Sequence, residues 1–450
     1  MNKKIPVGLA ITLALIAMTV TFSITFVLSQ QQFTTTVNAV RNREKIYSKL
    51  AEIDKYVRDN YYGKIDDNKL YDMLGAGYIL GTGDPNAVYY TAEQYAELID
   101  IQNGQLLSVG VELKKDASGY AAVTKVYAGS PAEEVGIVKG NYITKINDTE
   151  VKGLTVDTIM DMLRGEEGTS VAVTFLDSTN ISKDVQIPRR KFDASSVEFQ
   201  LVPNTTYGYV KIASFTNTTP SDFDSAVRQL MSQGATALIF DLRGNKGGIL
   251  SSAVECVDIL APEGPLAYAQ YKDGTMEEMG WSGEDEVNLP MVVLVNGDTA
   301  SSAELFAAEL KEFGKAKIVG TTTYGKGTIQ KEPQQLSDGS AISITVAALL
   351  TGDQNSFNGT GISPDVEVAL KAEEESGLYL LPLDVDPQVA KAVEVLNTAA
   401  QTAPEQPTTE DAASTDQAAA DQTAEQPAED TALQPTEESA SQPADASETE

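Results

Sequence analysis

Apolar residues along the chain follow three spacings, and each predicts a different kind of element. An uncharged, mostly apolar run of 24 residues extends from Ile5 to Leu28. After it, Ile46, Leu50, Ile53 and Val57 recur at intervals of four, three and four residues, which is typical of one face of an α-helix. Beyond about residue 105 the apolar residues gather in short runs that indicate strands. The chain is therefore expected to combine a long N-terminal apolar segment, a helical region and strand-rich domains.

The first apolar run is long enough to cross a bilayer, because a helix rises by about 1.5 Å per residue. Lys3 and Lys4 precede it, and the residues from Phe26 to Gln30 offer no clear small-x-small cleavage site. This favours a retained membrane anchor over a removed signal peptide. The two lysines favour an N-terminus on the cytoplasmic side, although Arg41 and Lys45 on the far side weaken the argument. We expect a single-pass anchor over residues 1–32, in a cell membrane, with the rest of the chain outside the cytoplasm.

Residues 39–101 form the helical region. Two interpretations remain open from the pattern alone. The region is either a stalk that holds the following domains away from the membrane, or a surface through which two copies of the chain form a homodimer.

Residues 105–188 show the order of a PDZ domain, an α+β fold. Alternating strands are expected over Val109 to Leu113 and Ala121 to Val126, and Ser130-Pro131-Ala132 opens a short helix. A second helix over Val156 to Arg164 and a strand over Val171 to Leu176 complete the expected order. Because PDZ domains add an extended peptide C-terminus to their sheet, this resemblance implies a protein or peptide partner.

Residues 192–370 alternate apolar strands with helices, the signature of an α/β core. Ala237 to Phe240 and Val292 to Val295 are continuous apolar runs, as expected of strands covered on both faces. Each run ends in a polar loop that contains glycine and leads into a helix. Catalytic groups tend to gather at such turns, where helix N-termini offer unpaired N–H donors.

Composition separates the end of the chain from the rest. After a helical segment over residues 371–400, residues 401–450 consist mainly of Ala, Gln, Thr, Pro, Ser, Asp and Glu. They hold 13 acidic residues and no Lys or Arg, and are expected to be a disordered acidic tail. Of the formal net charge of −32, the first 400 residues still carry −19, so the chain is not expected to bind nucleic acid.

Two residue types limit the possible chemistry. The chain has no histidine and one cysteine, Cys256. A Ser-His-Asp triad, a histidine-ligated zinc site and a histidine general base are therefore excluded. The apolar spacing around Cys256 indicates a helix, so we interpret it as a buried structural thiol. Acid–base chemistry is left to Lys, Asp, Glu or Tyr, and neither a cofactor nor a metal is expected.

The first candidate site element is the turn from Asp241 to Gly248, which follows a buried strand. Its adjacent glycines, Gly247 and Gly248, allow backbone N–H groups to approach a substrate carbonyl. The turn is either an oxyanion-hole loop or an ordinary glycine-rich turn, and the stretch alone does not distinguish the two.

The second element is the turn from Asn296 to Leu305, which places Ser301 at the N-terminus of a helix. There the helix end and the Ser302 N–H would stabilise a negative oxygen. However, the four residues from Ser301 to Glu304 also fit the Ser-x-x-Glu capping box, which satisfies N–H groups without any chemistry. Taken alone, the turn favours capping.

The third element, Gly320 to Gln330, holds Lys326 between two glycines. A lysine desolvated beside a serine can lose its proton near neutral pH and act as a general base. Lys326 would then take the proton of Ser301 and return one to the leaving amine. Gln330 could hold the lysine amine by a hydrogen bond.

Together, these three elements resemble the carboxyl-terminal processing peptidases, also called tail-specific proteases. The motifs are Asp-Leu-Arg-x-Asn-x-Gly-Gly, the Asn-x-x-x-Ala-Ser helix start, and Gly-x-Thr-x-Tyr-Gly-Lys-Gly-x-x-Gln. Asp338 to Ser340 and Gly361 to Val366 also look like the closing strands of that family, so the resemblance spans roughly residues 45 to 370. It implies a crotonase-like α/β core and a serine endopeptidase that processes or degrades extracytoplasmic proteins.

The resemblance also implies a role for individual residues. The implied set is Ser301 as nucleophile, Lys326 as general base, Gln330 as its orienting partner, Gly247 or Gly248 with Ser302 as the oxyanion hole, and Ser108, Val109, Gly110 and Val111 as the peptide-carboxylate loop of the PDZ domain.

The sequence departs from the family pattern at two places. Lys246 stands where the family commonly has proline, and Thr299 where it has the first serine of a Ser-Ala-Ser repeat. Losing the proline makes the oxyanion loop less constrained. The alternative function is a catalytically inactive PDZ scaffold that binds peptides at the cell surface. A Ser-x-x-Lys acyl enzyme is a third possibility, but no Ser-x-x-Lys occurs in the chain.

Overall fold

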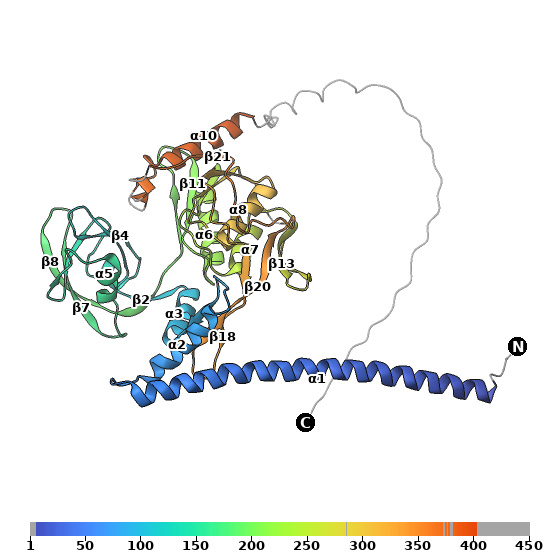
Figure 1. Ribbon diagram of the computed structural model, residues 1–450. Helices are drawn as coiled ribbons and strands as arrows, with labels where there is room; N and C mark the ends of the chain where they lie inside the picture. The colour runs from blue at the N-terminus through green and yellow to red at the C-terminus, as the bar shows by residue number, and fades with distance from the viewer. Residues whose placement is uncertain (1–5, 285, 372–373, 376, 379–380, 403–450) are drawn as a thin grey trace, which may run out of the picture. The chain divides into compact units, whose positions relative to one another are not determined.

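The computed structural model describes residues 6–284, 286–371, 374–375, 377–378 and 381–402 (Figure 1). The chain divides into two units, Met1–Ala400 and Gln401–Glu450. Only the first two residues of the second unit are described. The prediction that the acidic tail is disordered concerns residues outside the described ones. The elements described below lie in the first unit, apart from the last two residues of α10.

The N-terminal region is helical, as the apolar spacing predicts. It consists of α1 (Val7–Asn60), α2 (Asp67–Leu80), the short strand β1 (Val88–Tyr90) and α3 (Ala92–Gln102). The predicted membrane span is not supported: in the part of the chain that the structure describes, no helix is both long and apolar enough to cross a bilayer. The apolar run instead begins a helix of 54 residues that continues into a polar and charged stretch.

The region that resembles a PDZ domain is an antiparallel sheet with two short helices packed against it. Its sheet follows the order β3-β4-β5-β7-β8, with β6 paired to β5. The elements are β3 (Val111–Lys115), β4 (Ala121–Val126), α4 (Pro131–Glu134), β5 (Tyr142–Ile146), β6 (Thr149–Glu150), α5 (Val156–Leu163), β7 (Ser170–Leu176) and β8 (Ser182–Pro188).

Sequence periodicity accounts for the PDZ core. Ile159 and Leu163, one helical turn apart on α5, are buried, and so are the alternating residues Val171, Val173 and Phe175 of β7. The predicted strand over residues 109–113 begins two residues later, because the positive φ of 87° at residue 110 interrupts it.

The α/β core is built on a six-stranded sheet of order β10-β11-β12-β15-β16-β21. Only the β10–β11 pair is antiparallel. The elements are β10 (Val197–Leu201), β11 (Tyr207–Ile212), α6 (Thr219–Ser232), β12 (Ala237–Asp241), α7 (Leu250–Asp258), β15 (Met291–Val295), α8 (Ser302–Glu312), β16 (Ala316–Gly320), β21 (Val366–Glu367) and α10 (Pro387–Thr402).

Both faces of this sheet are buried, as the continuous apolar runs predict. Leu238 and Phe240 of β12 pack with apolar residues of α6, α7 and α8. Ile239, which points to the opposite face, packs with Val389 and Leu396 of α10. The predicted helical segment near the end of the domain thus covers the second face of the sheet and is part of the core.

Smaller sheets connect the parts. A four-stranded sheet of order β14-β13-β20-β17 extends the core, β1 joins β19 and β18, and β2 pairs with β9 between the PDZ domain and its neighbours. These strands are β2 (Gln105–Ser108), β9 (Arg190–Asp193), β13 (Gly264–Tyr271), β14 (Met276–Ser282), β17 (Thr328–Gln330), β18 (Gln334–Gln335), β19 (Ala341–Ser343) and β20 (Thr345–Thr351). Through β1 the N-terminal region is therefore attached directly to the core.

Candidate active site

Three turns meet at one edge of the main sheet. They follow the neighbouring parallel strands β12, β15 and β16, whose carboxyl ends lie side by side. Backbone hydrogen bonds join them, from the Ala300 N–H to the Asn245 carbonyl (2.9 Å) and from the Tyr324 N–H to the Thr299 carbonyl (3.0 Å). The structure therefore brings together the three segments singled out in the sequence.

Ser301 lies at the N-cap of α8 in an unusual backbone conformation. Its φ is 60° and its ψ is −126°, a combination that glycine adopts easily and other residues adopt at a cost of about 1–3 kcal/mol. The other non-glycine residues with positive φ in the described chain are Asn or Gln. Strain of this kind gathers at functional sites, and here it occurs at the predicted nucleophile.

Glu304, one turn into α8, connects the serine turn to the lysine turn. Its side chain is fully buried. Oε2 accepts hydrogen bonds from the Ser301 N–H and the Lys326 N–H, both at 2.8 Å. Oε1 accepts from the Gly325 N–H at 2.7 Å and from the Thr323 hydroxyl. The Ser-x-x-Glu signature thus does cap the helix, but the same carboxylate also fixes the backbone of the predicted general base.

Lys326 is half-buried, and burial lowers the pKa of its amine while the charge of Asp84 acts in the opposite direction. The amine donates no hydrogen bond to any residue that the structure describes. The predicted contact between the Lys326 amine and the Ser301 hydroxyl is therefore not formed here. General bases often align with their partner only when substrate is bound.

Gln330 is the last residue of β17. Its Nε2 donates to the Thr328 hydroxyl at 2.9 Å and to the Thr345 hydroxyl at 3.3 Å. No hydrogen bond joins it to the Lys326 amine among the described residues. The amide oxygen of Gln330 accepts no hydrogen bond within that part of the chain.

The glycine loop lies against the serine turn. A Cβ at Gly247 would lie 2.9 Å from the Ser301 Cβ, and a Cβ at Gly248 would clash with the Phe215 carbonyl at 2.1 Å. The Gly247 N–H donates to Asn245 Oδ1 at 2.8 Å. The N–H groups of Gly248 and Ser302, in contrast, donate to no acceptor in the described structure. Of the two glycines that the sequence offers for an oxyanion hole, the geometry favours Gly248 paired with Ser302.

Asn245 constrains this loop, although the family's proline at the next position is replaced by Lys246. Its side chain is fully buried and donates from Nδ2 to the Ile212 carbonyl at 2.9 Å while Oδ1 holds the Gly247 N–H. Lys246, next to it, is exposed. Hydrogen bonds from one side chain thus restrict a loop that the sequence alone suggests is less constrained.

A buried ion-pair network supports the start of the same loop. Arg243 pairs with Asp241 and with Asp386 (2.8 Å), and donates to Gln388 Oε1 at 2.8 Å. Burial alone would raise the pKa of Asp241, but the guanidinium of Arg243 lowers it below its usual value. Asp386 and Gln388 lie at the start of α10, so the C-terminal helix contacts the arginine at the start of the glycine loop.

The predicted peptide loop of the PDZ domain lies between β2 and β3. Val109 and Val111 are buried, and the Gly110 N–H donates to the Ser108 hydroxyl at 2.9 Å. A Cβ at Gly110 would lie 2.1 Å from the Ser130 Cβ, so only glycine fits this approach. One of the N–H groups expected to hold a peptide carboxylate is therefore occupied by the protein's own hydroxyl.

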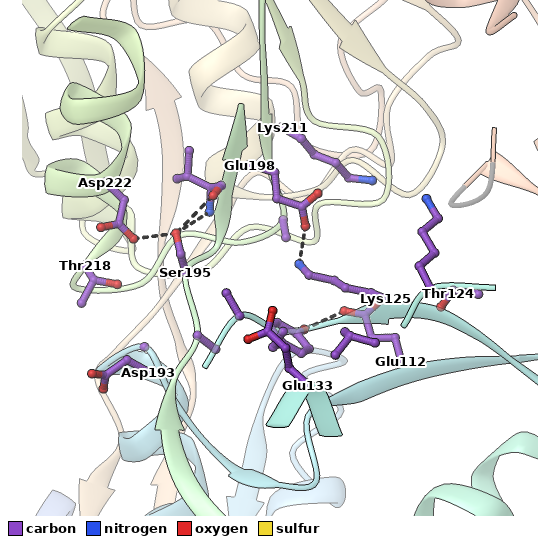
Figure 2. A pocket seen from close by; sticks show the side chains of 18 of the residues that line it. Glu112, Thr124, Lys125, Glu133, Asp193, Ser195, Glu198, Lys211, Thr218 and Asp222 are labelled. Atoms are coloured by element: carbon purple, nitrogen blue, oxygen red, sulfur yellow. Dashed lines mark hydrogen bonds and ion pairs between the residues drawn. The ribbon is translucent and has the colours of Figure 1, made fainter. Parts of the chain in front are cut away.

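A cavity of about 940 Å³ lies apart from this site, between PDZ residues and residues around β10 and β11 (Figure 2). Lys125 spans the two sides. It pairs with Glu198 at 2.5 Å and lies 4.4 Å from the centre of the Tyr127 ring. The lining extends to Arg243 and Gly244 but includes neither Ser301 nor Lys326.

Sequence reasoning missed two residues of the site. Glu304 was visible only as a capping residue, and nothing local to it shows that it also binds the lysine turn. Asp84 appears in the short Asp-Pro-Asn turn of the N-terminal region, more than 200 positions before Lys326. No signal short of the fold connects that turn to the lysine.

Two family models match the chain. The model described as peptidase family S41 matches residues 206–368, and the model described as PDZ domain matches residues 122–177. The three turns of the site fall within the first match, and the PDZ sheet overlaps the second.

Known relatives carry related names. The chain is 33% identical over 325 residues to "Carboxy-terminal processing protease CtpA" of Bacillus subtilis, covering 72% of this chain and 69% of that one. It is 32% identical over 324 residues to "Probable CtpA-like serine protease" of Staphylococcus aureus, covering 71% of this chain and 64% of that one. Among solved structures it matches the photosystem II D1 C-terminal processing protease, with 29% identity, a TM-score of 0.43, and coverage of 65% of this chain and 80% of that one.

The role of Glu304 predicts a large loss of stability in Glu304→Gln. The new NH₂ group would face two of the four donors that the carboxylate now accepts from, and each donor left without an acceptor costs about 1–3 kcal/mol. Denaturant unfolding followed by circular dichroism measures the change. Glu255→Gln, an exposed position on the neighbouring helix α7, is the matched control and should change the free energy of unfolding by less than about 0.5 kcal/mol. Equal stability of the two variants would contradict the role given to Glu304.

Proposed function

Because the chain belongs to peptidase family S41, the carboxy-terminal processing serine proteases, we propose that Ser301 is the nucleophile and Lys326 the general base with which it hydrolyses peptide bonds. The chain is a serine protease with a PDZ domain. The assignment of roles to its residues is our proposal.

The observation that supports this assignment most directly is that the Glu304 side chain binds both the serine turn and the lysine turn. One buried carboxylate accepts from the backbone of Ser301 and from the backbone of Lys326, so the two turns cannot separate without leaving buried N–H groups unpaired. A capping box without catalytic purpose would have no reason to include the lysine turn.

The proposed reaction begins with Lys326 in its neutral form. Its amine accepts the proton of the Ser301 hydroxyl while Oγ attacks the scissile carbonyl carbon. The carbonyl oxygen becomes negative. It is stabilised by hydrogen bonds from the N–H groups of Gly248 and Ser302, which donate to no other acceptor in the described structure. Lys326 then gives the proton to the leaving amine, and an acyl-enzyme remains. Water, deprotonated by Lys326, hydrolyses that ester and restores Ser301.

This reaction requires a lysine that is neutral at working pH. Desolvation by the surrounding turns lowers the pKa of Lys326, which supports the role. The hydrogen bond between the Lys326 amine and Ser301, absent from the structure, is expected to form in the substrate complex. Gln330 Oε1 is proposed to accept a second hydrogen bond from the amine and so direct its lone pair toward the serine.

Replacement of either residue of the proposed catalytic dyad, Ser301 and Lys326, tests the assignment. Ser301→Ala and Lys326→Ala should each reduce cleavage of an unstructured protein substrate by at least about 10³-fold, because the nucleophile or its base is lost. Lys331→Ala, an exposed lysine nearby, should cleave at the wild-type rate. Wild-type cleavage by either dyad variant would overturn the assignment. If the unaltered chain binds peptides but neither cleaves them nor reacts with a serine-directed probe, it is the inactive scaffold.

We further propose that the PDZ domain takes the C-terminus of the substrate. The loop from Ser108 to Val111 precedes the edge strand β3, which is the position at which a PDZ domain adds a peptide strand. For the carboxylate to be held there, the Ser108 hydroxyl must release the Gly110 N–H.

A free substrate C-terminus should therefore matter. Amidation of the C-terminus of a peptide substrate removes the charge that the loop would hold, so KM should rise roughly tenfold or more while kcat changes little. Steady-state kinetics on the paired peptides gives both constants. The same KM for both peptides would exclude capture of the carboxylate.

The location of the enzyme is also a proposal. The helix α1 carries a series of exposed apolar side chains, among them Ile16, Phe22 and Phe26, and positive residues precede it in the sequence. We propose that this segment places the catalytic part outside the cytoplasm, attached to the membrane by one segment.

A reporter enzyme that is active only outside the cytoplasm, fused after Gln32 and separately after Ala400, should be active at both positions. Membrane fractionation of the full chain shows whether the segment is retained. An active cytoplasmic reporter at the same positions would reverse the proposed orientation.

A further inference from the structure

The N-terminal region contributes a carboxylate to the surroundings of the lysine turn. Asp84, in the loop between α2 and β1, accepts hydrogen bonds from the Thr345 N–H at 2.8 Å and from the Thr345 hydroxyl at 3.0 Å. It also accepts from the Asn86 N–H at 3.0 Å, which closes a tight turn around Pro85. Asp84 is thus fixed from both sides, by its own loop and by the first residue of β20.

The charge on Asp84 sets the direction of the hydrogen bonds that follow. A carboxylate can only accept, so the Thr345 hydroxyl must use its single proton on Asp84. Its lone pairs then face outward, and the Gln330 Nε2 donates to them at 3.3 Å. The result is a polarised chain from the Gln330 amide through a hydroxyl to an anion.

A second arm from the same loop acts on the same amide. The Asn86 Nδ2 donates to the Thr328 hydroxyl at 3.3 Å, and that hydroxyl also accepts from the Gln330 Nε2 at 2.9 Å. Both side-chain acceptors around Gln330 therefore take its NH₂ group. Turning the amide over would place its oxygen against the Thr345 hydroxyl oxygen, whose proton is used on Asp84. It would also place it against the Thr328 carbonyl oxygen, which accepts from the Gln330 Nε2 at 3.4 Å.

We propose that Asp84 is a positioning residue for the reaction: acting through the Thr345 hydroxyl, it fixes the orientation of the Gln330 amide so that Oε1 is presented to the Lys326 amine. This inference rests on the proposed roles of Lys326 and Gln330. It gives the N-terminal helical region, predicted only as a stalk or a dimer surface, a part in completing the catalytic site.

Electrostatics adds a second effect of Asp84. Hydrogen bonding from the Thr345 N–H lowers its pKa, so the carboxyl is charged at neutral pH. Two carboxylates face the lysine turn, Asp84 from the N-terminal loop and Glu304 from α8. Burial lowers the pKa of Lys326, and the charge of Asp84 raises it. Asp84 therefore orients Gln330, the proposed partner of Lys326. It also keeps the pKa of Lys326 higher than it would be if burial acted alone.

The variant Asp84→Asn removes both effects together. With an NH₂ group in place of one oxygen, a donor faces Thr345. The Thr345 hydroxyl can then turn its proton toward Gln330, so one of the contacts that fix the orientation of the Gln330 amide is lost. We expect kcat for a peptide substrate to fall roughly 10- to 100-fold, the usual effect of a misplaced catalytic group. Because the charge that raises the Lys326 pKa is gone, the rising limb of the pH profile of kcat/KM should move to lower pH.

Two further variants give the comparison. Thr345→Val has nearly the same shape and keeps the N–H bond to Asp84 but lacks the hydroxyl, so kcat should fall as in Asp84→Asn while the rising limb stays in place. Thr345→Ser should restore most of the lost kcat. Asp72→Asn removes another carboxylate of the N-terminal region, one that accepts from the Tyr89 hydroxyl at 2.9 Å, and should alter neither quantity. Thermal unfolding of the full-length variants shows that each one is folded.

The outcomes are distinct. A wild-type kcat in folded Asp84→Asn overturns the inference, and so does a reduced kcat with an unmoved pH limb, because a purely structural effect would lower the rate at every pH alike. If Ser301→Ala and Lys326→Ala still cleave the substrate, the proposed function fails instead, whatever Asp84→Asn does.

Discussion

The arrangement of the site depends on one buried carboxylate. Glu304 has no solvent to satisfy it and accepts four hydrogen bonds, from the backbone of the serine turn, from two consecutive N–H groups of the lysine turn and from the Thr323 hydroxyl. Moving either turn alone would leave an acceptor or a donor unpaired in a dry interior. The strained backbone at Ser301 persists because the helix behind it and the lysine turn beside it are both held by this group.

The sheet supplies the second constraint. Parallel neighbours place their carboxyl ends at one edge, so the turns after β12, β15 and β16 have to lie together. Burial on both faces makes that edge rigid, since α6 to α8 cover one face and α10 the other. Within this frame the glycines of the loop after β12 allow the main chain to approach Ser301, and Asn245 holds that loop in place. The lysine amine is the part left free to move.

Much of this was predictable because it rests on local patterns. Continuous apolar runs predicted β12 and β15, alternation predicted β3 and β4, and the Ser-Pro-Ala start predicted α4. What could not be predicted depends on contacts between distant segments. Asp84 and Thr345 are separated by 261 positions, and a lone aspartate before a proline predicts only a turn. Glu304 was assigned only the local part of its role, because a serine and a glutamate three residues apart indicate helix capping and say nothing about the lysine turn. The apolar run near the N-terminus was interpreted without its continuation into a helix that extends to Asn60.

The buried guanidinium of Arg243 has a consequence for the order in which the enzyme is assembled. Its partner Gln388 follows it by 145 positions, and Asp386 lies beside that partner. In a chain made from its N-terminus, the glycine loop is therefore synthesised long before the acid that completes its support. Until α10 emerges from the ribosome and docks, Arg243 has Asp241 as a partner but lacks Asp386 and Gln388, so part of the support beneath that loop is missing. A nascent chain that already contains both the serine and the lysine would thus still lack a finished catalytic site, which would delay proteolysis until the domain is complete.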